Sequence, residues 1–208
     1  MARRLWNIFT SFIVTFSVLG AVAFLILAPE MPDTAGLWRA KKSPGVTMLA
    51  ADGSVVTQRG AFNSTMVGVV EMPPHLPLAI IATEDRRFYG HFGMDIIGLS
   101  RAMVANVKAG DVVQGGSTIT QQIVKNTLLT REKTITRKIK EALLALQLES
   151  MYQREFGAKA KEKLLELYIN GSFFGTNAYG VEDAAQVYFG KPAANLTLLE
   201  AAVLAWLP

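Results

Sequence analysis

The first apolar stretch of the chain is continuous rather than periodic. Residues 5–28 contain no charged side chain and lie between Arg3-Arg4 and Pro29-Glu30. A helix of that length crosses the ~30 Å hydrocarbon core of a bilayer at ~1.5 Å per residue. A cleaved signal peptide has a shorter apolar stretch, and cleavage after residues 21–23 would leave the apolar residues 24–27 at the new N-terminus. We therefore predict a transmembrane anchor, with the paired arginines on the cytoplasmic side.

A linker and a hairpin are predicted next. Residues 29–44 are rich in proline, which is typical of a spacer between a membrane and a domain. Beyond them, apolar and β-branched residues alternate around Asp52-Gly53, a strong signal for a two-residue turn. The alternating residues are Val46, Met48, Ala50, Val55 and Thr57. We expect a small β-hairpin at the start of a domain that covers residues 45–208.

The segment from Asp95 to Gly110 has the pattern of a helix. Asp95 is suited to the N-cap, and Gly110 is suited to the left-handed position that ends a helix. The apolar residues at helical spacing are Ile96, Leu99, Met103, Val104 and Val107. The later members of this set, together with Val112 and Val113, either belong to the core or form a surface that faces a bilayer. We favour the core for most of them.

The remaining apolar positions also follow helical spacing. Two pairs fit the capping boxes that open helices. These pairs are Thr118 with Gln121 and Thr197 with Glu200. A further helix is expected from Thr134 onward. In that helix Glu141 follows Arg137 by four positions and Lys138 by three, so one face presents a carboxylate beside two cations. The fold class is therefore mainly α, with a small N-terminal β element.

Composition and charge narrow the possibilities. At 208 residues, the chain has room for one globular domain and an anchor. Hydrophobic residues make up 50% and the net charge is +4, which disfavours disorder. The absence of cysteine excludes disulfides and thiolate metal sites. Basic residues outnumber acidic ones between 121 and 163, but aromatic residues that could stack on bases are sparse there, so we expect no nucleic-acid partner.

Five segments carry the candidate chemistry. They are Glu84-Asp85-Arg86-Arg87-Phe88 with His91, Gly115-Gly116-Ser117-Thr118 with Gln121-Gln122, Arg137-Lys138-Ile139-Lys140-Glu141, the segment from Asn170 to Lys191, and the segment from Leu196 to Ala202. In this order and spacing they resemble the five motifs of the peptidoglycan glycosyltransferases, the transglycosylases that polymerise the cell-wall precursor lipid II. The resemblance extends over residues 45–208, and five ordered motifs are far more specific than any single one.

The resemblance implies a fold, a reaction and a location. The fold would be a lysozyme-like helical domain with two lobes around a cleft. The reaction would be an inverting transfer from a growing glycan chain on a polyprenyl diphosphate to the 4-hydroxyl of lipid II, which forms a β-1,4 bond. With the predicted anchor, the chain would be a single-pass protein of the bacterial inner membrane. Its catalytic domain would lie on the outer side, where other cell-wall synthesis proteins could join it.

By the same resemblance, two carboxylates are catalytic. Glu84 is the general base that takes the proton of the attacking hydroxyl. Glu141 assists departure of the diphosphate, either directly or through a divalent cation such as Mg or Mn. Lys125 is the first cation that we place beside the diphosphate. The other expected binding residues are Asp85, Arg101, Ser117, Thr118, Gln121, Gln122, Arg137 and Lys138. His91 is expected to be a hydrogen-bonded structural residue.

Each cluster taken alone has a simpler interpretation. Residues 84–87 would be a surface ion-pair cluster, residues 115–118 a flexible turn, and residues 137–141 an exposed, salt-bridged helix face. We set these interpretations aside because the segments occur together, in the order of the family's motifs. A muramidase or lytic transglycosylase remains an alternative function, as does a non-catalytic, membrane-anchored cell-wall scaffold. The cations around Lys125 and the predicted anchor favour synthesis.

The chain departs from the family pattern in two places. Residues 156–161 look inserted and are expected to alter a surface loop or a helix end. Asn177 stands where a glycine is common, and asparagine tolerates the positive φ of such a turn. Neither Ser-x-x-Lys nor Lys-Thr-Gly, the strings of a transpeptidase domain, occurs in the sequence. The chain is therefore either a piece of a bifunctional penicillin-binding protein or a monofunctional enzyme.

Overall fold

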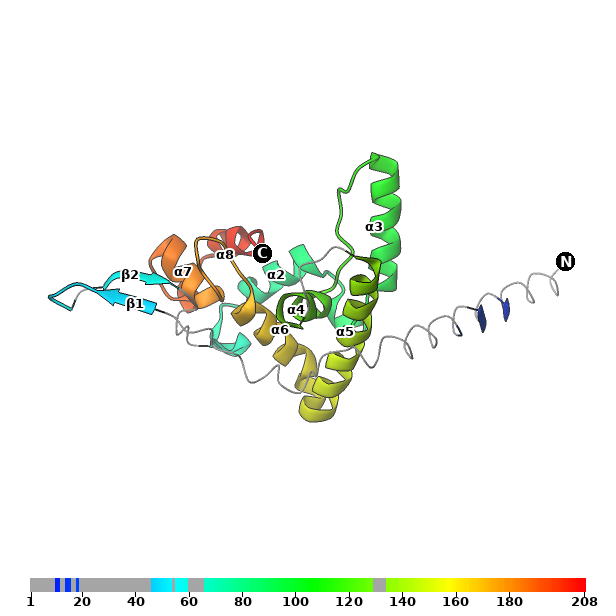
Figure 1. The fold of residues 1–208 in the computed structure, drawn as a ribbon, viewed down its shortest axis with the longest axis horizontal. Helices are drawn as coiled ribbons and strands as arrows, with labels where there is room; N and C mark the ends of the chain where they lie inside the picture. The colour runs from blue at the N-terminus through cyan, green and yellow to red at the C-terminus, as the bar shows by residue number, and fades with distance from the viewer. Residues whose placement is uncertain are drawn as a thin grey trace.

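The computed structural model describes residues 10–11, 14–15, 18, 46–53, 55–59, 66–128 and 134–208. This part of the chain is mainly helical, as predicted (Figure 1). The predicted anchor at residues 5–28 lies outside the described residues except for a few positions, and the predicted linker lies outside them entirely. No helix within the described residues has the length and apolar character needed to cross a bilayer.

Two short strands precede the helices. Strand β1 (Val46–Leu49) pairs antiparallel with β2 (Val55–Arg59), with one irregularity of register. Gly53 lies in the turn between them at φ +83°, and its N–H donates to the carbonyl of Ala50 at 2.9 Å. A positive φ of this size suits glycine, which has no Cβ to clash with the backbone.

The helices follow in a nearly continuous series. In chain order the elements are η3 (Val69–Glu71), α2 (His75–Glu84), η4 (Phe88–Gly90), α3 (Ile96–Ala109), α4 (Ile119–Leu128), α5 (Ile135–Phe156), η5 (Gly157–Lys159), α6 (Ala160–Gly171), α7 (Val181–Phe189), η6 (Ala193–Asn195) and α8 (Leu198–Ala205). Helix α4 packs against α5 and α6, and α2 packs against α8. Helix α4 thus lies near the centre of the helical body (Figure 1).

The core is formed where α2, α4, α5, α6 and α8 meet. Its largest fully buried side chains include Leu76, Ile80, Phe88, Ile119, Leu144, Leu148, Leu164, Leu165, Phe174 and Leu204. Burying such side chains is the main favourable contribution to folding, at about 25 cal/mol per Å² of apolar surface. Because both α2 and α4 are anchored in this core, the C-terminal end of α2 and the first turn of α4 are held close together.

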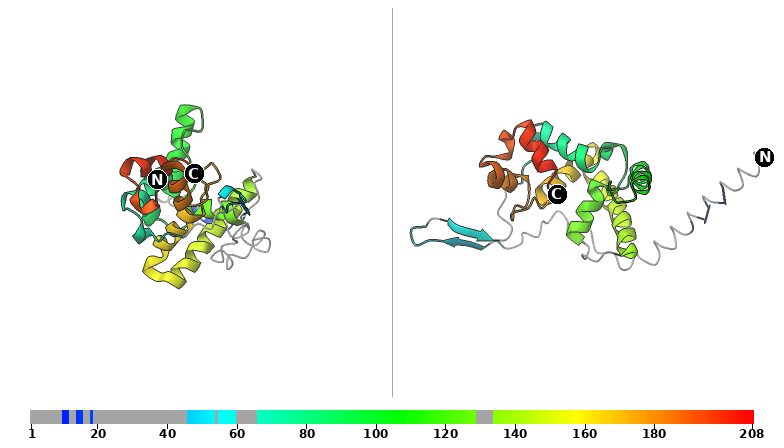
Figure 2. Two further views of the ribbon diagram at one scale, coloured as in Figure 1. Left: turned by 90° about the vertical axis from the view of Figure 1, so that its left-hand side faces the viewer. Right: turned by 90° about the horizontal axis from the view of Figure 1, so that it is seen from above.

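Helix α3 projects from the helical body (Figures 1 and 2). Its predicted ends are confirmed: the Asp95 carboxylate accepts from the N–H of Gly98 at 2.9 Å, and Gly110 follows the helix at φ +70°. The expectation that the later apolar residues of α3, and Val112 and Val113 beyond it, mostly belong to the core is wrong. Met103, Val104, Val107, Val112 and Val113 are all exposed. The helix instead packs through small residues, since Gly98 and Ala102 are its buried positions.

The two predicted capping boxes are also confirmed. Thr118 N–H donates to Gln121 Oε1 at 3.0 Å, and Gln121 N–H donates to Thr118 Oγ1 at 3.2 Å. Thr197 and Glu200 exchange the corresponding bonds at the start of α8. Asn177 has φ +61°, so the turn that usually has a glycine there is preserved by an asparagine.

The segment that looked inserted lies at helix ends, one of the two places expected for it. Residues 156–161 cover the end of α5, η5 and the start of α6. Lys161 extends inward, where its Nζ lies 2.6 Å from Glu149 Oε1 and 4.5 Å from the centre of the Phe88 ring. Glu149 is buried on α5 and also accepts from Thr120 Oγ1 of α4 at 2.8 Å. One lysine therefore connects α4, α5, α6 and the turn that follows α2.

We expect Lys161→Met to lower the free energy of unfolding by about 3 kcal/mol, because it leaves the buried Glu149 charge without its cation. Urea denaturation monitored by circular dichroism measures the loss. Lys163→Met is the matched control on the same helix, since Lys163 pairs with Glu166 at 2.6 Å but is more exposed. Surface pairs are worth about 0–1 kcal/mol. Equal losses in the two variants would contradict a structural role of the buried pair.

Candidate active site

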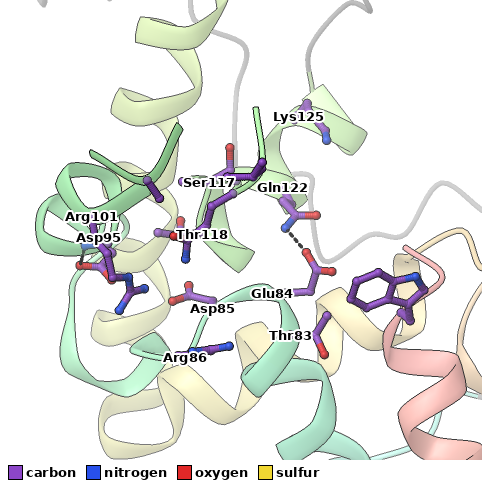
Figure 3. Close-up of a pocket in the computed structure, with 17 residues that line it drawn as sticks. Thr83, Glu84, Asp85, Arg86, Asp95, Arg101, Ser117, Thr118, Gln122 and Lys125 are labelled. Carbon is purple, nitrogen blue, oxygen red and sulfur yellow. Dashed lines mark hydrogen bonds between the residues drawn. The ribbon is translucent and has the colours of Figure 1, made fainter. Parts of the chain in front are cut away.

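A cleft of about 700 Å³ opens beside the end of α2. Its lining residues are Thr83, Glu84, Asp85, Arg86, Asp95, Gly98, Arg101, Ala105, Val113, Gln114, Gly115, Gly116, Ser117, Thr118, Gln122, Lys125 and Trp206. They come from α2 and the two residues after it, from α3 and its N-cap, from α4 and the loop before it, and from the residue after α8. The cleft thus brings together two of the predicted sequence clusters, which lie about thirty positions apart in the chain (Figure 3).

Glu84 is the last residue of α2 and extends into this cleft (Figure 3). Its Oε2 accepts from the side-chain amide of Gln122 at 2.7 Å. The Gln122 carbonyl oxygen in turn accepts from the hydroxyl of Tyr168 at 3.3 Å. Because the hydroxyl donates to that oxygen, the NH₂ group of Gln122 is directed toward Glu84. The Glu84 side chain is half-buried. Its carboxylate is held by one neutral donor, and no cation contacts it directly among the described residues.

Tyr168 is a site residue that the sequence analysis missed. It lies on α6, and its side chain is almost fully buried. Burial raises the pKa of its hydroxyl, and the nearby charge of Glu84 raises it further. The hydroxyl therefore stays protonated at any physiological pH and remains a donor to Gln122. No sequence signal links Tyr168 to Gln122, since the two are 46 positions apart.

Asp85 lies at the floor of the cleft, and its carboxylate is already engaged. His91 Nε2 lies 2.9 Å from both Asp85 oxygens, and the N–H of Ile119 donates to Oδ2 at 3.1 Å. An acidic side chain at this position satisfies a free amide of the first turn of α4. The prediction that His91 is hydrogen-bonded is confirmed at Nε2, and its structural role stays a prediction. Asp85 was expected among the binding residues and does line the cleft, and these contacts also make it the group that fixes α4 beside Glu84.

The end of the loop before α4 is held by contacts with the turn after η4 and with the first turn of α4. Thr118 Oγ1 donates to the carbonyl of Gly93 at 2.7 Å, and Thr118 and Gln121 are both buried. Gly93 has φ +67°, and a Cβ there would lie 2.9 Å from the backbone nitrogen of Leu146. The turn after η4 thus packs directly on the backbone of α5. Thr118 and Gln121 are used for capping, and Gln121 does not line the cleft.

Glu141 is buried on α5, and only 1% of its surface is exposed. It forms ion pairs with Arg137 and with Lys138, whose Nζ lies 2.8 Å from Glu141 Oε2. The same Nζ donates to Ser117 Oγ at 2.8 Å. Glu141, Arg137 and Lys138 are not part of the cleft lining, but Ser117 is. Lys138 therefore connects the buried carboxylate to the wall of the cleft.

The cations around this wall influence one another. The pKa of Lys138 lies below its usual range, mainly because of partial burial and also because Arg137 and Lys125 are nearby. Lys125 is exposed and lines the cleft three residues after Gln122, on the same face of α4 (Figure 3). An anion that binds among these positive charges is stabilised, because it reduces the repulsion between them. Arg101 of α3 is exposed and lines the opposite part of the cleft.

The described residues do not fit a protein-held Mg or Mn ion. The Glu141 carboxylate is already paired with two cations, and a hard divalent metal requires several oxygen ligands. In the part of the chain that the structure describes, no three His, Cys, Asp or Glu side chains lie close enough together to hold a metal. Sequence reasoning placed a tentative metal at Glu141, and the geometry gives that expectation no support.

The chain matches known proteins over nearly all of its length. A sequence model of the family described as transglycosylase matches residues 52–208. The chain is 42% identical over 203 residues to penicillin-binding protein 1A of Neisseria gonorrhoeae, an alignment that includes 98% of this chain and 25% of the relative. It is 44% identical over 197 residues to penicillin-binding protein 1A of Aquifex aeolicus, including 94% of this chain and 26% of the relative. The chain thus spans about a quarter of the length of these relatives.

Proposed function

The chain belongs to the transglycosylase family, and from this membership we propose that it polymerises peptidoglycan glycan chains from lipid II. In the proposed reaction, the 4-hydroxyl of lipid II attacks the anomeric carbon of a growing chain that is linked to polyprenyl diphosphate. The new bond is β-1,4 and the diphosphate leaves. This reaction needs a base at the hydroxyl and positive charge at the leaving group. The mainly helical fold is consistent with the lysozyme-like architecture expected for the family.

The observation that carries the proposal is the position of Glu84 in the cleft. Its carboxylate is reachable from the cleft, has a single fixed amide donor and has no paired cation among the described residues. A carboxylate held in this way can accept a proton, whereas one paired with arginine resists protonation. We assign Glu84 the role of general base. Gln122 and Tyr168 are positioning residues that fix the direction of its oxygen.

The leaving diphosphate is assigned to the wall of the cleft that is formed by α4 and the loop before it. Lys125 is exposed there, and Ser117 receives a bond from Lys138. A diphosphate bound there would lie near Lys125 and near the Ser117 hydroxyl that Lys138 contacts, so its negative charge would meet positive charge. The buried Glu141 holds Arg137 and Lys138 in place, so we assign it a positioning role at the leaving group. We also assign to Arg101 of α3, which lines the cleft, a contact with the sugar or the diphosphate.

The exposed apolar side of α3 is proposed to contact the bilayer. Exposed apolar patches on a soluble monomer are normally small, and a larger one indicates a contact surface. Here Met103, Val104 and Val107 stand on a helix that projects from the body. A membrane contact at this helix would bring the cleft to a substrate whose polyprenyl tail stays in the bilayer. The predicted anchor at residues 5–28 would hold the domain at the outer face of the inner membrane.

A fluorescent label tests the membrane contact. The chain has no cysteine, so a single Val107→Cys variant can be labelled with an environment-sensitive dye. After reconstitution of the full chain in anionic vesicles, we expect a blue-shifted emission that lipid-borne quenchers reduce. Val70→Cys is the matched control, because Val70 is equally exposed but lies on η3. Identical quenching at the two positions, or none at position 107, would contradict the contact.

The proposed activity is tested with labelled lipid II and the purified full chain. Separation of the products on a gel should give a ladder of glycan chains. A muramidase or lytic transglycosylase would instead release fragments from finished peptidoglycan, so both substrates are offered in parallel. Fragment release without a ladder would favour the cleaving enzyme. Binding without turnover on either substrate would favour a non-catalytic scaffold.

A further inference from the structure

One aromatic side chain lies at the cleft without any assigned role. Of the described residues that line the cleft, Trp206 is the only aromatic one, and 80% of its surface is exposed. Covering a tryptophan side chain removes more apolar surface from water than covering almost any other side chain. The place of Trp206 in the lining of the same polar cleft as Glu84 makes its indole ring available to a ligand that binds there. We propose that Trp206 is a stacking platform for the sugar ring of the acceptor.

The backbone of Trp206 is rigidly supported. The residue follows α8, and its N–H donates to the carbonyl of Val203 at 3.2 Å. Leu204 and Ala205, immediately before it, are buried in the core. At the other end, the capping box of α8 is reinforced by Lys191, whose Nζ lies 2.7 Å from Glu200. A platform needs such support, because a mobile side chain loses conformational entropy when it binds.

The position of α8 assigns Trp206 to one end of the cleft. Helix α8 packs against α2, and α2 ends at the proposed base Glu84. The residues assigned to the diphosphate come from α4 and the loop before it. Trp206 therefore belongs to the wall on which the acceptor hydroxyl gives up its proton. This assignment of a sugar rests on the proposed function.

A flat aromatic ring suits a pyranose for physical reasons. A sugar in the chair form has hydroxyls around its rim and a patch of C–H groups on each face. The face of the indole is electron-rich, and it attracts the slightly positive hydrogens of such a patch. Stacking leaves the rim hydroxyls free for polar groups such as Thr83 and Glu84. The contact would hold the ring while its 4-hydroxyl approaches the base.

Kinetics separate this role from a structural one. With a defined polyprenyl-diphosphate tetrasaccharide as saturating donor, we expect Trp206→Ala to raise the KM for lipid II as acceptor about tenfold, equivalent to ~1.4 kcal/mol. The kcat should change by less than about twofold, because the chemistry uses other groups. Trp206→Phe should recover most of the loss. Leu199→Ala is the matched control, since Leu199 is exposed on the same helix but does not line the cleft. A fall in kcat with unchanged KM would overturn the proposal.

Fluorescence provides a readout that does not need turnover. The chain contains three tryptophans, so the variant Trp6→Phe, Trp38→Phe retains Trp206 alone. We expect a saturable, blue-shifted emission when the soluble disaccharide of N-acetylglucosamine and N-acetylmuramic acid is added. A response to detergent micelles without sugar, equal to that with sugar, would identify a lipid contact and overturn the proposal. No response at any disaccharide concentration would also overturn it.

The two tests distinguish failure of the subsite from failure of the proposed function. A chain that polymerises lipid II with the same KM in wild type and Trp206→Ala retains its function but has no stacking subsite. A chain that makes no polymer, yet shows the saturable emission change with the disaccharide, has the sugar subsite without the proposed reaction.

Discussion

The variant Glu84→Gln is expected to polymerise lipid II about 10²-fold to 10⁴-fold more slowly than the wild type, the range that a positioned general base contributes. Glutamine has almost the same shape, and its amide oxygen can still accept from Gln122, so the contact at 2.7 Å survives. What is lost is the ability to take a proton. Initial rates at saturating lipid II measure the effect, and melting temperatures confirm that the fold is intact.

The control for this variant is Glu155→Gln. Glu155 is exposed on α5 and does not line the cleft, so the same chemical change there should leave the rate within about twofold. If Glu84→Gln retained half of the wild-type rate while Glu155→Gln behaved as expected, the assignment of the base to Glu84 would be wrong.

Removing the proposed charge at the leaving group should have the second-largest effect. We expect Lys125→Ala to lower kcat about 10²-fold, because deleting one donor to a developing anion typically costs about 10²–10³ in kcat. Lys125→Arg should recover only part, since a guanidinium presents its donors in a different geometry. Lys159→Ala is the control, as an exposed lysine that does not line the cleft. Acceptor KM should change little in all three variants.

Glu141→Gln tests whether the buried carboxylate works together with Lys125. It removes the charge that holds Arg137 and Lys138, so kcat should fall although Glu141 does not line the cleft. In the double variant with Lys125→Ala, the free-energy cost should be smaller than the sum of the two single costs, because groups that act on one charge are not additive. Strict additivity with an intact fold would mean that the two residues act independently.

Sequence reasoning was most accurate where the signal is local. The N-cap Asp95, the terminal Gly110 and the capping boxes that begin with Thr118 and Thr197 were all placed correctly, because each depends on contacts within one turn of helix. The positive φ of Asn177 was anticipated for the same reason. Local chemistry is enough to say where a helix starts or ends.

Tertiary contacts were the part that sequence could not supply. Helical spacing in α3 identified an apolar set, but spacing does not say which neighbour covers it, and the helix packs through Gly98 and Ala102 instead. Lys161 looked like part of an insertion, yet it neutralises Glu149 across two helices. These contacts depend on how helices pack, which a pattern along one helix does not encode.

The candidate site shows the same division. The motifs identified Glu84, Gln122 and Lys125, which the structure brings to one cleft. They did not show that Asp85 is used to cap α4 or that Glu141 is buried away from the cleft. Tyr168 and Trp206 were missed because both reach the site from distant parts of the chain. An aromatic residue in an apolar segment is indistinguishable from a core residue until its exposure is known.

The anomeric configuration of the newly formed bond tests the central claim most directly. If Glu84 activates the acceptor for a single direct displacement, the α-linked diphosphate must give a β bond, because each displacement inverts the carbon. The full chain is incubated with lipid II, and the coupling constant of the new anomeric proton is measured by NMR on the isolated tetrasaccharide unit. A β-1,4 linkage that forms with wild type and disappears with Glu84→Gln is the predicted result. An α linkage, or the same yield of β product from the Glu84→Gln variant, would contradict the account.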